Sequence, residues 1–342
     1  MMENFYTARV HGFPNLTARG LLTGVGSSEQ MTQEGVLSLV VVLGSSVSLV
    51  GLVFAFITYS LFSDLRNLSG TTLMNLLAAL FMAQLLYVIG VGGVQDSELC
   101  VALAFSLQYI RLTVFCWLTA MTHDMYTTFR ENVNLVPVAD PRMRTNFWRY
   151  SLLAWGAPLL LLGEAVALQL RQKGGNLLDT ASLRSTNCWF LDRDAFVAGF
   201  VAPVGVLLVV VALLLARGAA MARLTAGLQV ERRARERMRR RRRLQLCLFI
   251  KVTLLLSTVA TLGALSKLTG INAFWVAFNV AHGLQGIAVA LCVTCNCRVL
   301  KIYTRTLRRR GSNGKTRLRP PGGPSKSTSL QLLTWEPSPD SV

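Results

Sequence analysis

Seven long apolar runs, separated by short polar segments, dominate the hydropathy pattern of this 342-residue chain. About 20 mostly apolar residues suffice for a helix to cross the roughly 30 Å hydrocarbon core of a bilayer. The pattern therefore predicts an all-α protein, a bundle of seven transmembrane helices. The predicted spans are Val36–Phe62, Thr71–Val94, Val101–Phe129, Arg149–Leu170, Ala195–Ala216, Leu244–Leu268 and Asn272–Cys297.

The basic residues between these spans predict their orientation. If the N-terminus is outside, the cytoplasmic segments hold 26 Lys and Arg residues and the outer segments hold seven. Cytoplasmic loops of membrane proteins carry such an excess. We expect a multi-pass plasma-membrane protein with its N-terminus outside and its C-terminus inside.

Three further segments flank the span region 36–297. Residues 1–35 are predicted to form a short extracellular segment. Residues 298–310 alternate basic and apolar positions, which is typical of an amphipathic helix lying on the inner leaflet. Residues 311–342 are rich in Gly, Pro, Ser and Lys and are predicted to be a disordered cytoplasmic tail.

A net charge of +18 would also suit a nucleic-acid-binding protein. However, most of the basic residues lie in 217–243 and 298–326, next to apolar runs, so they are expected to face the anionic lipids of the inner leaflet and not nucleic acid. Within 228–243, opposite charges recur at i,i+4 without Gly or Pro. This predicts that the sixth span continues as a helix into the cytoplasm.

Arg111 lies near the middle of the third span, where an ionisable side chain should face the bundle interior or a water-filled cavity. Gln108 lies one turn away on the same face, and Glu164, in the outer half of the fourth span, is the only carboxylate deep enough on that side to be a partner. These residues predict either a polar ligand pocket or a buried structural ion pair.

Deeper in the membrane, Asp124 of the third span and Lys251 of the sixth have similar predicted depths. An ion pair between them would lock the two helices in a closed state. The alternative is that Lys251 extends to the inner interface without a partner.

Cysteine residues suggest two modifications. Cys100 and Cys188 are both predicted to be extracellular, where a disulfide would tie the loop 171–194 to the third span; two free thiols are the alternative. Cys292, Cys295 and Cys297 lie at the inner end of the seventh span. No further metal ligands are evident near them, so we expect acylation of Cys295 and Cys297 or no modification, and no metal site.

Other motifs are weaker. Asn15-Leu16-Thr17 is a glycosylation sequon on the predicted outer side, and the C-terminal Asp340-Ser341-Val342 could bind a PDZ-type groove. No nucleophile–base pair or metal-ligand set is evident, so neither an enzyme nor a cofactor is expected.

Several segments, taken together and in order over about residues 36–300, resemble the Methuselah-like receptors, a branch of the secretin/adhesion-type (class B) G-protein-coupled receptors. These segments are Leu76-Leu77, Ala83–Gly90, Phe115–Arg130, Ala154–Leu159, Cys188-Trp189, Phe200–Val204 and Gly283–Gly286.

The resemblance implies a receptor that opens at its inner face when a ligand binds and then engages a heterotrimeric G protein through 130–149 and 217–243. Arg130, Arg239 and Arg240 are the expected G-protein-facing residues, and arrestin is a further expected partner of the tail. The implied ligand pocket adds Trp189 and Gln285 to the polar residues of the third and fourth spans. The ligand itself is not indicated.

This chain departs from the family at several positions. Leu73 and Met121 occupy the positions of a hydrogen-bonded His–Glu pair, and His282 replaces an Asn of the seventh span. The outer segment of about 35 residues is too short for the family's disulfide-bonded ectodomain. We therefore expect either that the bundle alone recognises the ligand or that the chain is a partial product. A transporter or channel and a non-signalling receptor-like protein remain alternatives.

Overall fold

A computed structural model describes residues 25–62, 68–91, 97–131, 143–172, 196–227 and 231–295 of the chain. These residues are helical apart from short connections, and no strand occurs among them. The predicted segments 298–310 and 311–342 lie outside the described residues. The elements are α2 (Val25–Leu61), α3 (Leu68–Val91), α4 (Ser97–Glu131), α5 (Met143–Gln172), η2 (Val197–Val201), α8 (Ala202–Gly227), α9 (Arg232–Thr269) and α10 (Asn272–Thr294).

Seven of the helical segments are long and apolar enough to cross a membrane. The predicted all-α bundle of seven spans is therefore confirmed. The orientation stays a prediction: the end at which α4 and α10 begin is the predicted extracellular end, and the end at which α3, α5 and α9 begin is the predicted cytoplasmic end.

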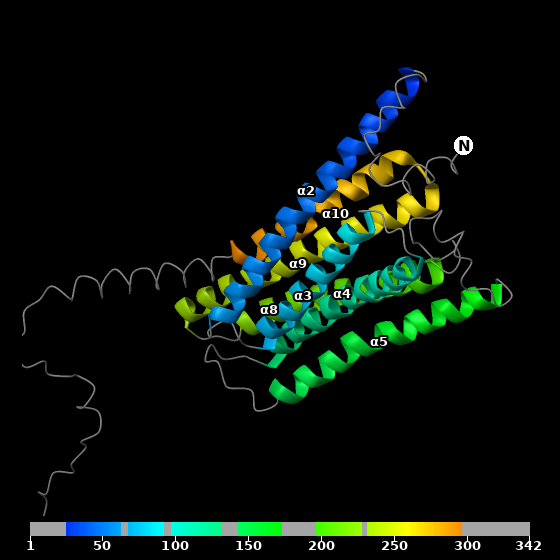
Figure 1. Cartoon of the computed structure of the whole chain (residues 1–342). Coiled ribbons are helices and arrows are strands. Elements are labelled where there is room, and N and C mark those ends of the chain that lie inside the picture. Colours follow the sequence, from blue (N-terminus) through cyan, green and yellow to red (C-terminus); the bar gives the residue numbers. More distant parts are fainter. Residues whose placement is uncertain are drawn as a thin grey trace, which may run out of the picture. The chain divides into compact units, whose positions relative to one another are not determined.

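The helices form one bundle in which α2 packs along α10, and α4 contacts α3, α5 and α8 (Figure 1). Trp117, Leu118, Met121 and Met125, all on α4, are among the largest side chains that are fully buried. In contrast, α5 exposes Trp148, Leu152 and Leu160, as a lipid-facing helix would. Accordingly, α4 forms the centre of the bundle and α5 its edge.

Local sequence features explain the ends and irregularities of these helices. Gly270 adopts φ 67°, and its N–H donates to the carbonyl of Ser266 at 3.1 Å, which ends α9. The predicted helical extension of the sixth span is confirmed, because α9 begins at Arg232; that this extension is cytoplasmic stays a prediction. One of its expected i,i+4 pairs, Arg232–Glu236, has an N–O distance of 3.5 Å.

The fifth span begins with a short π-helical turn, η2, that the apolar pattern did not predict. In η2, Gly199 lies against Ala165 of α5, and Phe200 stacks on Phe196 with a centroid distance of 5.5 Å. This turn brings two aromatic rings to the interior of the bundle. Such turns often occur at functional sites.

Candidate functional site

A cavity of about 250 Å³ lies among α3, α4, η2, α9 and α10. It extends from Arg111 in the middle of α4 to Gly270 at the end of α9, so it occupies the predicted extracellular half of the bundle. Its lining is mainly apolar and aromatic: Leu80, Ala83, Val114, Phe115, Phe196, Phe200, Leu256, Val259, Ala260, Gly263, Trp275 and Phe278. The polar and charged lining residues are Gln84, Arg111, Ser266, Lys267, His282 and Gln285.

Arg111 is held in the cavity wall by two aromatic rings. Its Cζ atom lies 5.8 Å from the ring centroid of Tyr87 and 5.9 Å from that of Phe278. Cations within about 6 Å of an aromatic centroid are attracted by the negative face of the ring. The two rings therefore orient the guanidinium and lower the cost of placing its charge among apolar side chains.

Hydrogen bonds fix the wall around Arg111. Tyr87 Oη donates to Asn279 Oδ1 at 2.5 Å, and Asn279 Nδ2 donates to the carbonyl of Trp275 at 2.8 Å. Gln84 Nε2 donates to Ser45 Oγ at 2.8 Å and to the carbonyl of His282 at 3.2 Å. These bonds join α3 to α2 and α10 and give the cavity a preformed shape.

His282 completes this wall on α10. Its ring centroid is 4.1 Å from that of Tyr87 and 5.5 Å from that of Phe278, the same two rings that contact Arg111. The side chain is 5% exposed, and its Nδ1 atom has no hydrogen-bond partner among the described residues. A buried polar atom of this kind in a cavity wall is able to hydrogen-bond to a ligand atom or a water molecule.

Only some of the predicted pocket residues line the cavity. Arg111 and Gln285 line the cavity. Gln108 is buried but lies outside the lining, because its Nε2 donates to the carbonyl of Gly199 at 3.3 Å. Glu164 is exposed on α5 and also lies outside the lining. Trp189 lies outside the described residues.

Lys267, Trp275, Phe278 and His282 are among the lining residues that the sequence did not predict. A signal for three of them exists, since Trp275, Phe278, His282 and Gln285 recur at the spacing of one helix face. Such a face holding aromatic and polar side chains in an otherwise apolar span indicates a surface that does not face lipid.

At the opposite end of the bundle, Arg242 joins α9 to α4. Its Nη1 donates to the carbonyl of Phe129 at 3.3 Å, and its Cζ lies 5.3 Å from the centroid of the Phe129 ring. Arg242 is only 7% exposed, whereas Arg130, Arg239 and Arg240 are exposed. Arg242 thus closes the predicted cytoplasmic end, and the three predicted G-protein-facing arginines lie on its surface.

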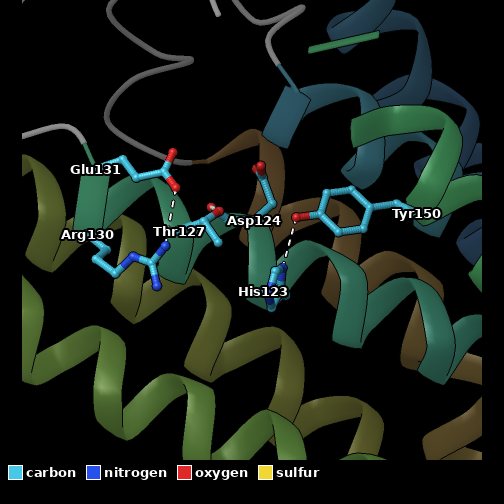
Figure 2. Close-up of polar contacts among 6 residues, drawn as sticks. All are labelled: His123, Asp124, Thr127, Arg130, Glu131 and Tyr150. Carbon is cyan, nitrogen blue, oxygen red and sulfur yellow. Dashed lines mark hydrogen bonds and ion pairs between the residues drawn. The ribbon is translucent and has the colours of Figure 1, made fainter. Parts of the chain in front are cut away.

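The lock expected between Asp124 and Lys251 is not formed. Lys251 is exposed on α9, Asp124 is buried on α4, and no ion pair joins the two in the described part of the chain. The reason is geometric: the Lys251 side chain lies on the outside of the bundle, whereas Asp124 lies in its interior. Figure 2 shows Asp124 next to His123, whose Nδ1 lies 2.9 Å from Tyr150 Oη of α5.

The remaining site predictions concern cysteine and asparagine residues. Cys295 is an exposed free thiol at the end of α10. Cys188, Cys297 and Asn15 lie outside the described residues, as does the side chain of Cys100. Among the described residues, no group of three His, Cys, Asp or Glu side chains could hold a metal ion.

Comparison with known proteins places this bundle in a family. Residues 34–289 match the family model of the seven-transmembrane receptors of the secretin family. The chain is 26% identical over 257 residues to human cadherin EGF LAG seven-pass G-type receptor 1, a match covering 75% of this chain and 8% of the relative. It is 26% identical over 280 residues to rat adhesion G protein-coupled receptor L4, covering 81% of this chain and 35% of the relative.

A third relative, human adhesion G protein-coupled receptor E3, is 27% identical over 190 residues, covering 56% of this chain and 27% of the relative. The chain thus spans about a third or less of the length of these relatives. The narrower resemblance to Methuselah-like receptors stays a prediction. The family match and the seven apolar helices together show that this chain is a multi-pass plasma-membrane protein that belongs to the secretin family of seven-transmembrane receptors.

Proposed function

We propose that this chain binds an extracellular ligand in the cavity lined by Arg111 and passes the signal to a heterotrimeric G protein at its other end. The observation that carries the proposal is the placement of two features on the same helices. The cavity contacts α4 and α9 in their predicted extracellular halves, and Arg242 joins α4 and α9 at the predicted cytoplasmic end.

The mechanism follows from this arrangement. A G protein needs a crevice at the cytoplasmic end, and such a crevice opens when α9 moves away from α4. This movement breaks the contact between Arg242 and Phe129. A ligand that fits the cavity better in the open state then shifts the population toward it.

The exposed arginines near this end are the proposed docking surface. Arg130 lies in the last turn of α4, and Arg239 and Arg240 lie on the part of α9 that precedes its apolar run. In the same region, anionic lipids of the inner leaflet are proposed to contact the basic side chains of α9. Arrestin and a PDZ-type domain are proposed partners of the tail.

The proposal is tested by substituting the closing residue. Arg242→Ala should raise basal recruitment of a mini-G protein about three- to tenfold, because the loss of a hydrogen bond that contributes about 0.5–1.5 kcal/mol to the closed state shifts the population toward the open state by a factor of this order. Recruitment would be measured by bioluminescence energy transfer in living cells. Signals would be normalised to surface expression.

Two variants make this test specific. Arg223→Ala removes an exposed arginine from α8 near the same end and should leave basal recruitment unchanged. The double substitution of Arg239 and Arg240 by Ala, combined with Arg242→Ala, should reduce the raised signal. If Arg242→Ala reaches the cell surface but recruits no member of a full mini-G panel above the unsubstituted chain, the proposed function is wrong.

A further inference from the structure

Among the described residues that line the cavity, the charged side chains are of one sign. Arg111 and Lys267 line it, and none of its described lining residues is Asp or Glu. Arg111 lies in the middle of α4, where the surroundings are apolar and a positive charge is costly. A ligand carrying a negative charge would gain from both cations, and a positively charged ligand would be repelled.

The second observation is the buried nitrogen of His282. This side chain is 95% buried, lines the cavity, and has an Nδ1 atom with no partner in the described part of the structure. A neutral imidazole protonated at Nδ1 can donate one hydrogen bond from this atom. A carboxylate oxygen is a suitable acceptor, and charge-assisted bonds of this kind are stronger than neutral ones.

Arg111 and His282 both line the cavity and both contact the same two rings, which places them in the same part of its wall. The Tyr87 ring centroid lies 5.8 Å from Arg111 Cζ and 4.1 Å from the His282 ring centroid. For the Phe278 ring, the corresponding distances are 5.9 Å and 5.5 Å. A guanidinium and an imidazole N–H are donors of the kind that bind a carboxylate.

The rest of the cavity determines the body of the ligand. Phe196, Phe200, Trp275, Leu256 and Val259 form apolar and aromatic walls. The volume of about 250 Å³ is just below the roughly 300–1,000 Å³ of pockets for drug-sized molecules. We propose, given that the cavity is the ligand site of the proposed function, that it binds a small organic acid with an apolar body, whose anionic group lies between Arg111 and His282.

The first test uses a matched pair of molecules. The full chain, purified into nanodiscs of neutral phosphatidylcholine, is titrated by ¹⁹F NMR with 4-(4-fluorophenyl)butyrate and with the corresponding amide. The two have nearly the same size and shape and differ in charge. The acid should bind at least tenfold more tightly; equal or tighter binding of the amide would overturn the proposal.

The second test uses variants of the chain. Arg111→Gln should weaken binding of the acid at least tenfold and leave binding of the amide nearly unchanged, and His282→Phe should do the same to a smaller degree. Lys251→Gln, which removes an exposed cation of α9 outside the cavity, should change neither. If Arg111→Gln does not fold, the acid–amide comparison on the unsubstituted chain still decides the question.

Such an acid could come from the lipid phase or from solution, and adding oleate to the nanodisc distinguishes the two sources. If oleate displaces the fluorinated acid, the site is one for a lipid-derived carboxylate. If the fluorinated acid stays bound, the site is one for a soluble acid. Either result requires the acid preference. Mini-G recruitment by Arg242→Ala is measured on the same chain, so coupling without acid preference overturns this inference and leaves the proposed function standing.

Discussion

A single hydroxyl group connects the two helices with the most extensive contact in the bundle. Ser48 of α2 is fully buried, and its Oγ donates to the carbonyl of Gly283 at 2.6 Å. The same oxygen accepts the N–H of Ile287 at 3.1 Å. Gly283 and Ile287 are i,i+4 neighbours in α10, so the hydroxyl satisfies both groups where the two helices touch.

Removing this hydroxyl should destabilise the receptor without changing its outer surface. Ser48→Ala is expected to cost about 0.6–1.7 kcal/mol, from the average to the largest value typical of hydrogen bonds between membrane helices. Thermal unfolding in detergent, followed by fluorescence-detected size-exclusion chromatography, would show a midpoint lower by several degrees. Ser46→Ala is the control, because Ser46 Oγ donates to Val42 of its own helix at 2.8 Å and is exposed. Equal midpoints for the two variants would contradict the assignment.

Individual residues differ in how well the sequence could place them. Arg111 was predicted to face the interior because a charge in an apolar run rarely faces lipid. Arg242 could not be distinguished from Arg239, Arg240, Arg241 and Arg243, since all five have the same chemistry. Only the packing of α9 on α4 determines which arginine lies over Phe129.

At the scale of whole helices, α2 and α10 approach closely through small residues. An added Cβ at Gly286 would lie 2.7 Å from Ser48 Cβ and 2.9 Å from Leu52 Cδ1. An added Cβ at Gly51 would lie 3.1 Å from Ile287 Cδ1. Small residues permit such contacts, and van der Waals packing is a main source of helix association in membranes.

Gly286→Ala should therefore separate the two helices and lower stability by about 1–3 kcal/mol, the usual cost of overpacking a well-packed core. The same unfolding measurement applies, with Gly163→Ala of α5 as the matched control. No heavy atom lies within 4 Å of a Cβ added at Gly163, so that variant should unfold at the same or a higher temperature. A Gly286→Ala chain as stable as the control would show that α2 and α10 are not so tightly packed.

The spans were predictable because hydrophobic length is a strong signal, but their ends were less so. The helix α2 begins at Val25 and α8 continues to Gly227, beyond the apolar runs in both cases. Polar residues continue these helices without changing their geometry, so hydropathy alone misses the end turns. The π-helical turn η2 also escaped prediction, because its sequence is as apolar as the helix that follows.

At the scale of the whole molecule, function depends on which end of the bundle faces outward. The cavity lies in the half where α4 and α10 begin, and Arg242 lies near the opposite end. With the N-terminus outside, the cytoplasmic segments hold 26 Lys and Arg residues and the outer segments hold seven. This asymmetry favours the orientation in which the cavity is extracellular. The arginine-rich beginning of α9 contributes much of this excess. The same segment therefore helps to set the orientation of the bundle and forms part of the proposed G-protein surface.

The orientation is testable on intact cells with epitope tags at the two termini. An antibody should label the N-terminal tag without permeabilisation and the C-terminal tag only after it, because positively charged segments remain in the cytoplasm. An intracellular marker protein controls for leaky cells. Labelling of the C-terminal tag on intact cells would place the cavity on the cytoplasmic side. A ligand from outside could not then reach Arg111, and the arginines of α9 could not meet a G protein, so both proposed roles depend on this single charge asymmetry.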